Sequence, residues 1–315
     1  MSETHPTTFN GVVPTPAWAF DQYQRVRPWL PEGLPADSQP ETVHLQSLSP
    51  LIERFQVFVF DAFGVLNVGA RALPEALHRI RQLQQLGKTV LILSNAATAS
   101  HRALVGKYQD MGFAIRPDQL VSSRLVLEQF LQRSPRAGRF GVIAPASSAP
   151  ETLPMDWLPV RAGTREQTLD QLDGFVFLSS EHWQEDIHYE LALSLKRLPR
   201  PVLVANPDLV APRGKQLTLE PGYFAQLLTE QCDLTCEFFG KPHKAAFDAV
   251  LEKLDGIHPS DVLMVGDTLH TDILGGQAAG MKTLLVTSHG ALKGMDIPDC
   301  ISLAAIRPDY VAPVI

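Results

Sequence analysis

The sequence contains little cysteine and no long hydrophobic run. Its only cysteines among 315 residues are Cys232, Cys236 and Cys300, too few and too unevenly spaced for a disulfide framework. No second Cys or His pair follows them, so we interpret them as thiols of a reducing compartment rather than metal ligands. No apolar stretch reaches the ~18 residues of a membrane helix, and the first residues lack the basic start of a signal peptide. We therefore predict a cytoplasmic protein without a membrane partner.

Positive charge is also scarce. The chain carries 27 Lys and Arg residues against 34 Asp and Glu residues, a formal net charge of −7. Without an overall positive potential to attract phosphate backbones, a nucleic-acid partner is not expected. A small phosphorylated substrate stays open, because it needs only local positive charge or a metal ion. A hydrophobic content of 45% is typical of a well-packed globular protein.

The first 50 residues differ in composition from the rest of the chain. The first 40 of them are rich in proline, at positions 6, 14, 16, 28, 31, 35 and 40. The stretch from Trp18 to Leu30 is apolar enough to pack on another part of the protein. We expect residues 1–50 to form an extended arm with one helical turn rather than a domain.

A continuous apolar run from Phe55 to Phe60 predicts a strand that is buried on both faces, and it ends in Asp61. From there strands and helices alternate, which is the signature of a parallel sheet. We expect strands at 55–60, 89–93, 262–265 and 283–286. We expect helices at 73–83, 100–112, 123–132 and 243–254.

Residues 118–235, in the middle of the chain, show a separate series of alternating strands and helices. Strands are expected at 140–144, 174–178 and 202–205, and helices at 185–197 and 223–232. The fold class is therefore α/β, with a core domain formed by residues 51–117 and 236–315 and a second α/β domain inserted at 118–235.

Polar residues stand at the ends of several predicted strands. They are Asp61, Ser94 with Asn95, Lys241, and Asp267 with Asp272. Because the carboxyl ends of parallel strands share one edge of a sheet, these groups can converge. Carboxylates offer the hard oxygen ligands that Mg²⁺ prefers, and a lysine with a hydroxyl suits phosphate. Asp61 would then attack phosphorus and form an aspartyl-phosphate.

Four motifs in this order resemble the haloacid dehalogenase (HAD) superfamily. They are Phe60-Asp61-Ala62-Phe63-Gly64-Val65-Leu66, Leu93-Ser94-Asn95, Gly240-Lys241-Pro242, and Gly266-Asp267 followed by Asp272. The long insertion and its Ala205-Asn206-Pro207-Asp208 segment are similar to the C2-type cap of the class IIA, NagD-like subfamily. The resemblance covers about residues 53–292, and it implies a Rossmann-like parallel-sheet core with an inserted α/β cap and an Mg²⁺-dependent phosphatase.

Roles for individual residues follow from the resemblance alone. It implies that Asp61 is the nucleophile and an Mg²⁺ ligand, and that Lys241 holds both the nucleophile and the phosphate. The other implied roles are phosphate binding by Ser94 and Asn95, substrate contact by Asn206 and Asp208, and metal ligation by Asp267, by Asp272 and by the backbone oxygen of Phe63. A small phosphorylated metabolite as substrate and a homodimer through the cap are implied as well.

One position departs from the family pattern. The phosphatases of the superfamily place a second Asp two residues after the nucleophile, whereas this chain has Phe63. Loss of a general acid and base costs about 10²–10⁴-fold in rate, unless His270 or Asp208 substitutes. Two alternatives therefore stay open beside a phosphatase. One is a phosphate-binding homologue without turnover, and the other is a dehalogenase, which the two later carboxylates disfavour.

Several of these residues also have an ordinary structural interpretation. Ser94 and the Asn206-Pro207-Asp208 segment suit turns, Asp272 suits a helix cap, and Lys241 suits a solvated loop. His243, His270 and His289 are interpreted as loop or cap residues, since Mg²⁺ prefers oxygen.

Overall fold

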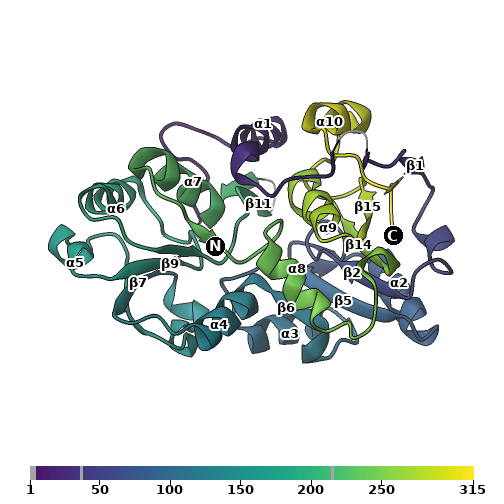
Figure 1. Ribbon diagram of the computed structural model, residues 1–315, viewed down its shortest axis with the longest axis horizontal. Helices are drawn as coiled ribbons and strands as arrows, with labels where there is room; N and C mark the ends of the chain where they lie inside the picture. The colour runs from purple at the N-terminus through teal and green to yellow at the C-terminus, as the bar shows by residue number, and fades with distance from the viewer. Residues whose placement is uncertain (1–4, 36–37, 214–215) are drawn as a thin grey trace. The chain divides into compact units, whose positions relative to one another are not determined.

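The computed structural model describes residues 5–35, 38–213 and 216–315. They form two compact units, each built on a parallel sheet (Figure 1). The seven-stranded unit comprises residues 23–94, 102–122 and 241–315, and the five-stranded unit comprises residues up to 22, 95–101 and 123–240. The chain therefore passes between the units more than once, and residues 1–50 are divided between them.

The sheet of the seven-stranded unit has the order β1-β16-β15-β14-β2-β5-β6, and every neighbouring pair is parallel. Its strands are β1 (Val43–His44), β2 (Val57–Phe60), β5 (Thr89–Ser94), β6 (Leu120–Ser122), β14 (Val262–Gly266), β15 (Lys282–Val286) and β16 (Tyr310–Ala312). A two-stranded antiparallel ribbon, β3 (Asn67–Val68) with β4 (Arg71–Ala72), follows β2.

Helices flank this sheet in Figure 1, as the spacing of apolar residues predicts. They are α2 (Pro74–Gln85), α3 (His101–Asp110), α8 (Lys244–Leu251), a π-helical turn η8 (Leu269–Ile273), α9 (Leu274–Ala278) and α10 (Ile297–Ala304). Pro74 begins α2, where its missing N–H is not needed, and Gly87 follows the helix with φ +71°. The predicted α/β fold class with a parallel-sheet core is confirmed.

The strand that precedes Asp61 lies in the middle of this sheet. β2 pairs with β14 on one side and with β5 on the other, so both of its edges are hydrogen-bonded. All four of its residues are fully buried. A strand covered on both faces needs apolar side chains at every position, which explains the unbroken run Val-Phe-Val-Phe.

The five-stranded unit has its own parallel sheet, in the order β13-β10-β9-β7-β8. Its strands are β7 (Arg139–Ile143), β8 (Asp156–Pro159), β9 (Gly174–Phe177), β10 (Val202–Val204) and β13 (Glu237–Phe238), and an antiparallel pair is formed by β11 (Val210–Arg213) and β12 (Gln216–Leu219). Its helices are α4 (Ser123–Arg133), α5 (Glu166–Asp170), α6 (Glu185–Arg197) and α7 (Pro221–Cys232).

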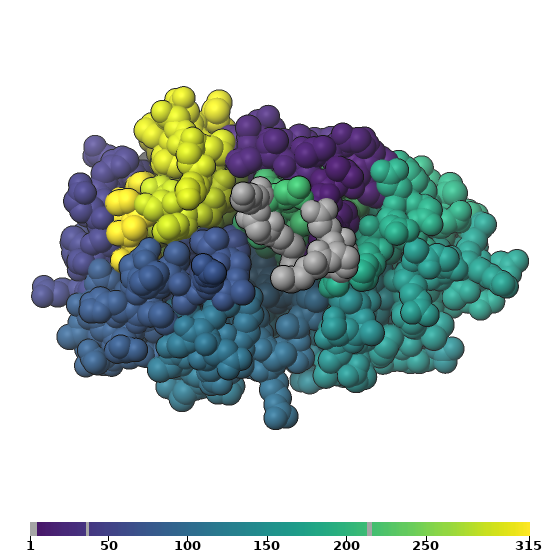
Figure 2. Space-filling model, turned by 180° about the vertical axis from the view of Figure 1, so that it is seen from behind, coloured from purple at the N-terminus to yellow at the C-terminus, as the bar shows by residue number. Residues whose placement is uncertain are grey.

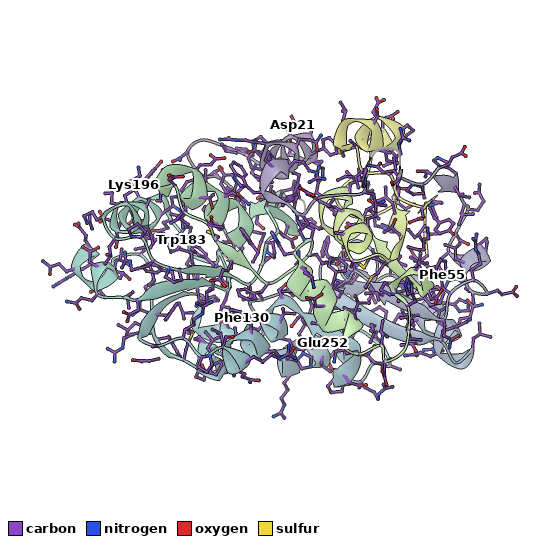
Figure 3. The ribbon with its side chains drawn as sticks, viewed as in Figure 1. Asp21, Phe55, Phe130, Trp183, Lys196 and Glu252 are labelled. Carbon is purple, nitrogen blue, oxygen red and sulfur yellow. The ribbon has the colours of Figure 1, made fainter. Side chains whose placement is uncertain are left out.

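Aromatic side chains fill the core of this unit. Trp183, labelled in Figure 3, meets Phe177 of β9 edge-on at a ring-centroid distance of 5.0 Å. Phe9, from the first residues of the chain, packs edge-on against Phe224 of α7 at 5.1 Å and is 1% exposed. The beginning of the chain is therefore part of this core.

The prediction of a single helical turn in the first 50 residues is wrong. The structure has an α-helix of 11 residues there, α1 (Pro16–Val26). Pro16 suits a helix start, no further proline follows before Pro28, and the buried side chains of Phe20, Tyr23 and Val26 recur at helical spacing. Three-residue 3₁₀ turns follow at Arg27–Trp29 and Ser49–Leu51. Within the described ranges, no helix has both the length and the apolar character that a bilayer crossing requires.

Candidate active site

Three of the predicted site residues stand at the carboxyl ends of neighbouring strands. Asp61 directly follows β2, Ser94 is the last residue of β5, and Asp267 directly follows β14. The backbone N–H of Asp61 still donates to the carbonyl of Val265 at 2.8 Å, so the ladder extends to the nucleophile candidate. All three residues are at most 8% exposed. Because the strand order is β14-β2-β5, Asp61 stands between Asp267 on one side and the hydroxyl of Ser94 on the other.

Lys241 joins two of the carboxylates. Its Nζ donates to Oδ1 of Asp61 in a short ion pair and to Oδ1 of Asp272 at 2.7 Å. It is 2% exposed, so the interpretation of a solvated loop lysine is wrong. The second oxygen of Asp272 accepts the backbone N–H groups of Asp267 and Thr268, at 3.2 and 3.1 Å. Asp272 therefore links Lys241 to the backbone of Asp267 and Thr268.

Hydrogen bonds fix the position of the Asp267 carboxylate, and two glycines leave room for it. Its Oδ2 accepts the N–H of Ala291 at 2.9 Å, and its Oδ1 accepts the hydroxyl of Thr268 at 2.8 Å. A Cβ added at Gly64 or Gly290 would lie 2.2 or 1.6 Å from Oδ2, and both glycines have positive φ. No other residue fits at these two positions without moving the carboxylate.

Burial controls the protonation of this cluster. Desolvation raises the pKa of Asp61 to about 7, against the opposing effect of Lys241. Desolvation also raises the pKa of Asp267 well above its ordinary value, and the neighbouring carboxylates Asp61 and Asp272 add to the effect. Burial alone would lower the pKa of Lys241, but the two carboxylates beside it outweigh burial and keep it protonated. When Asp61, Asp267 and Asp272 are all ionised, the cluster carries more negative charge than Lys241 alone balances, and the raised pKa values reflect this.

The donor set fits a hard divalent cation. Asp61, Asp267 and Asp272 each offer a carboxylate oxygen, and these oxygens lie within 4.8 Å of one another. Mg²⁺ prefers such oxygens and commonly takes only one or two carboxylates besides water and phosphate. Since Asp272 already serves Lys241 and two N–H groups, Asp61 and Asp267 are the better placed direct ligands. A bound cation would also offset the surplus negative charge.

Sequence reasoning missed Tyr108. This residue of α3 is 2% exposed, and its hydroxyl forms a hydrogen bond with the side chain of Ser94. Burial, with the charge of Asp61 as the next cause, raises the pKa of Tyr108, so the phenol keeps its proton. In the sequence Tyr108 continues the apolar stripe of Leu104 and Val105, and nothing distinguishes it from an ordinary core residue.

Phe63 occupies the position of the second acid and brings no proton-transfer group. It is half-buried, and its backbone bridges to Asn67 in the turn that leads to β3. Of the predicted substitutes, His270 is 1% exposed, and burial, followed by the charge of Arg27, lowers its pKa to about 3. A histidine that is neutral and enclosed in this way does not replace the missing acid.

A second group of predicted residues lies in the five-stranded unit. Asn95 Nδ2 donates to Asp208 Oδ1 at 2.8 Å, and the N–H of Asp208 donates to Asn206 Oδ1 at 2.9 Å. The latter bond is the turn predicted for the Asn-Pro-Asp segment. Asn206 also donates to Glu220 at 3.3 Å, a carboxylate that is 3% exposed and that sequence reasoning missed. The predicted residues therefore form one acidic cluster and one amide-rich cluster.

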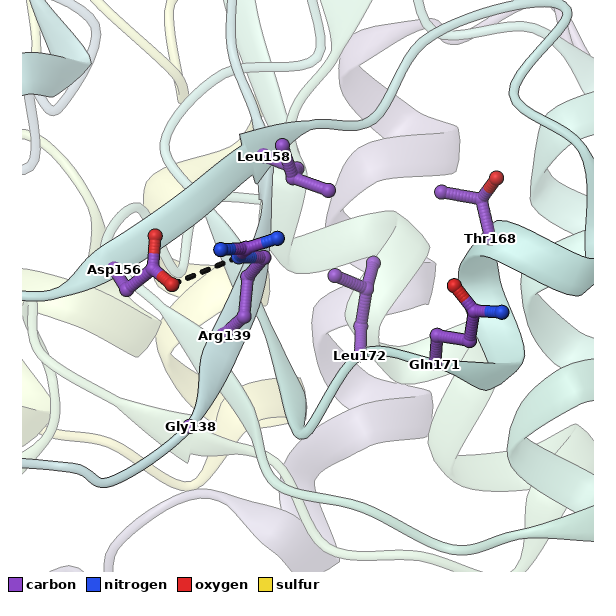
Figure 4. Close-up of a pocket in the computed structure, with 7 residues that line it drawn as sticks. All are labelled: Gly138, Arg139, Asp156, Leu158, Thr168, Gln171 and Leu172. Atoms are coloured by element: carbon purple, nitrogen blue, oxygen red, sulfur yellow. Dashed lines mark hydrogen bonds and ion pairs between the residues drawn. The ribbon is translucent and has the colours of Figure 1, made fainter.

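A cavity of about 380 Å³ lies at the β8 edge of the five-stranded sheet (Figure 4). An ion pair between Arg139 and Asp156, with a distance of 2.8 Å, crosses one side of it. None of its seven lining residues belongs to either cluster, so the cavity is not the site predicted from the sequence.

Two family models match this chain. The haloacid dehalogenase-like hydrolase model matches residues 58–152, and the HAD-hydrolase-like model matches residues 238–315. Between them they cover more than half of the chain, including the acidic cluster. The chain belongs to the haloacid dehalogenase-like hydrolases. The predicted family is thereby confirmed, and its relatives are consistent with class IIA.

Among related HAD-like proteins, the human glycerol-3-phosphate phosphatase is 27% identical over 300 residues, covering 82% of this chain and 88% of that protein. The crystal structure of a possible sugar phosphatase from Cytophaga hutchinsonii matches with a TM-score of 0.74 and 26% identity, over 86% of this chain and 98% of that one. A glycerol phosphate phosphatase from Mycobacterium tuberculosis, solved in complex with magnesium, shares the fold at a TM-score of 0.65 and 23% identity, over 83% and 75% of the two chains.

Proposed function

We propose that this HAD-like protein is an Mg²⁺-dependent phosphoric monoester hydrolase that acts on a small phosphate ester. One observation carries the proposal: Asp61, Lys241, Asp272 and Asp267 form a single buried cluster at the strand ends. The relatives named as glycerol phosphate and sugar phosphatases support a small polyol or sugar phosphate as the substrate class. The net charge of −7 gives no support to a nucleic-acid substrate.

In the first step the carboxylate of Asp61 attacks phosphorus and displaces the alcohol, which yields an aspartyl-phosphate. Lys241 holds Asp61 in place and adds positive charge beside the phosphoryl oxygens. Ser94 donates its hydroxyl proton to one of those oxygens, and the hydrogen bond with Tyr108 helps to hold the serine side chain in place. Mg²⁺, held by Asp61 and Asp267, supplies charge neutralisation and Lewis acidity when it is bound.

Proton transfer is the weak part of this reaction. The departing alcohol needs a proton, and the water that later attacks the aspartyl-phosphate must lose one. Phe63 can do neither, so both steps depend on solvent. Esters with good leaving groups, which depart without protonation, are therefore expected to react much faster than alkyl phosphates. For such esters, hydrolysis of the aspartyl-phosphate at Asp61 then limits turnover, because the attacking water has no general base.

The same residue supports a second candidate, a protein that binds a phosphorylated ligand in the HAD-like site without turning it over. Phe63 removes the proton-transfer group while Lys241, Ser94 and Asp267 keep their arrangement for phosphate and cation. Such a protein would need the full site for affinity but no general acid or base.

A hydrolysis assay against a panel of phosphorylated metabolites and p-nitrophenyl phosphate, with and without Mg²⁺, tests the proposal. We expect Mg²⁺-dependent release of phosphate that disappears in Asp61→Asn. An Asp61→Asn variant that retains the wild-type rate would refute the aspartyl-phosphate route. Tight binding of a panel member with no turnover in the wild type would establish the second candidate instead.

A further inference from the structure

The first residues of the seven-stranded unit lie against the loop that carries Asp267 and Asp272. Residues 23–35 fall outside the part of the chain on which the family resemblance rests. Gln24, near the end of α1, donates to the carbonyl of Leu303 in α10 at 2.5 Å. Both residues belong to the seven-stranded unit, whose C-terminal residues are yellow in Figure 2. This contact attaches the end of α1 to the unit that contains the acidic cluster.

The same glutamine contacts His270, which lies between the two acids in the chain. Gln24 Oε1 and His270 Nε2 are 2.6 Å apart. The carbonyl of Leu303 can only accept a hydrogen bond, so the amide nitrogen of Gln24 faces it and the amide oxygen faces the histidine. His270 Nε2 therefore carries the proton and donates it to Gln24. The orientation of the imidazole is fixed by a residue some 246 positions earlier in the chain.

Tyr23 stacks on one face of the imidazole. The two rings are stacked, with centroids 5.2 Å apart and an angle of 15° between their planes. His270 is 1% exposed, and the stack and the hydrogen bond are two of the contacts around it. The N-terminal segment also packs closely at Gly33. A Cβ added there would lie 3.2 Å from the side chain of Leu274, which begins the helix after the loop.

The loop itself has an unusual backbone. Leu269–Ile273 form a π-helical turn, a conformation that is rare and often found at functional sites. This turn brings Asp272 back so that it accepts the N–H groups of Asp267 and Thr268. His270 is inside the turn, so a shift of its ring would displace the acids on either side.

We propose that Tyr23 and Gln24 are positioning residues, which hold the loop of residues 266–272 in the shape that binds the divalent cation. This inference rests on the proposed function, because it concerns the same cation site. Outer residues that orient metal ligands typically contribute about 10–100-fold in metal affinity. Since Gln24 acts through a neighbour of the ligands, we expect an effect near the lower end, about tenfold.

The test compares Gln24→Met with Gln39→Met in the full chain. Gln39 is a matched control, because it also connects the N-terminal segment to the C-terminal part of the unit, through Ala305 and Arg307, while none of the hydrogen bonds seen for it in the described residues reaches the loop. Mg²⁺ binding is measured by calorimetry, and stability by urea unfolding in EDTA. We expect similar small losses of stability in both variants, with Mg²⁺ affinity about tenfold weaker in Gln24→Met alone.

A second pair separates ring packing from nonspecific damage. Tyr23→Phe keeps the stacked ring and should bind Mg²⁺ like the wild type, whereas Tyr23→Ala should resemble Gln24→Met. Equal Mg²⁺ affinities in Gln24→Met and Gln39→Met would overturn the inference. Activity is a separate readout: a wild type that binds Mg²⁺ but hydrolyses no ester contradicts the proposed function and leaves the positioning role standing. A wild type that does not bind Mg²⁺ contradicts both.

Discussion

Removing the charge of Asp61 should stabilise the protein when no cation is present. Burial raises the pKa of this carboxyl from 3.8 to about 7, so the folded state binds a proton that the unfolded state releases between these values. Stability is therefore lost as the pH rises from about 4 to about 7. The pKa difference corresponds to about 4 kcal/mol at pH 8, and Asn resembles the neutral acid. Lys241 keeps Asp272 as its partner in the variant.

The free energy of unfolding of Asp61→Asn, from urea titration in EDTA, should accordingly exceed that of the wild type by about 2–4 kcal/mol at pH 8 and by about 1–2 kcal/mol at pH 5. Adding Mg²⁺ should stabilise the wild type and reverse the order, because binding to the folded state alone adds stability. The same variant should release no phosphate from p-nitrophenyl phosphate.

Asp309→Asn is the matched control. This carboxylate is also 8% exposed, but it accepts from Lys282 at 2.7 Å and from Thr283 at 3.0 Å, away from other acids. Its replacement should lower stability by about 1–3 kcal/mol, with no influence of Mg²⁺. If Asp61→Asn were also less stable than the wild type at pH 8 in EDTA, the ion pair with Lys241 would outweigh desolvation, and the reasoning would be refuted.

Three further substitutions test other parts of the site. Phe63→Asp should raise the turnover of alkyl phosphates by about 10²–10⁴-fold, with a smaller gain on p-nitrophenyl phosphate; no gain on either ester would show that proton transfer is not what limits the wild type. Lys241→Met should lower kcat on p-nitrophenyl phosphate at least about 100-fold. A smaller loss would show that the positive charge of Lys241 does not stabilise the transferred phosphoryl group. Gly290→Ala places a Cβ 1.6 Å from Asp267 and should weaken Mg²⁺ binding at least about tenfold by calorimetry, unlike Gly294→Ala, where φ is +80° but nothing lies within 4 Å.

The acidic cluster could be predicted because its signals are local to strand ends. Asp61 follows an unbroken apolar run, and Asp267 follows another, so a parallel sheet brings them to one edge without any knowledge of side-chain packing. The predicted strands are ones that are buried on both faces, because burial on both faces requires a continuous apolar run that can be recognised in the sequence. Short edge strands were missed, among them β1 and β8, whose residues are largely exposed or half-buried and carry no such run.

Contacts between distant segments could not be predicted. The bond between Tyr108 and Ser94, and that between Gln24 and His270, depend on which helix packs beside which loop. Tyr108 has the helical spacing of a core residue, and Gln24 lies in a segment whose proline-rich composition predicts an exposed arm. In both cases only tertiary structure turns an ordinary side chain into a partner of the site.

The strand order also determines when the site can form during synthesis. β2, which ends at Phe60, lies next to β14, which begins at Val262. At about 5–20 residues per second, the ribosome needs about 10–40 s to make the roughly 200 residues between them. Throughout that time the apolar strand Val57–Phe60 has one unpaired edge, which exposes the nascent chain to aggregation. Asp61 cannot meet Lys241 or Asp267 before the last quarter of the chain begins to emerge, so premature release leaves a chain without a cation site.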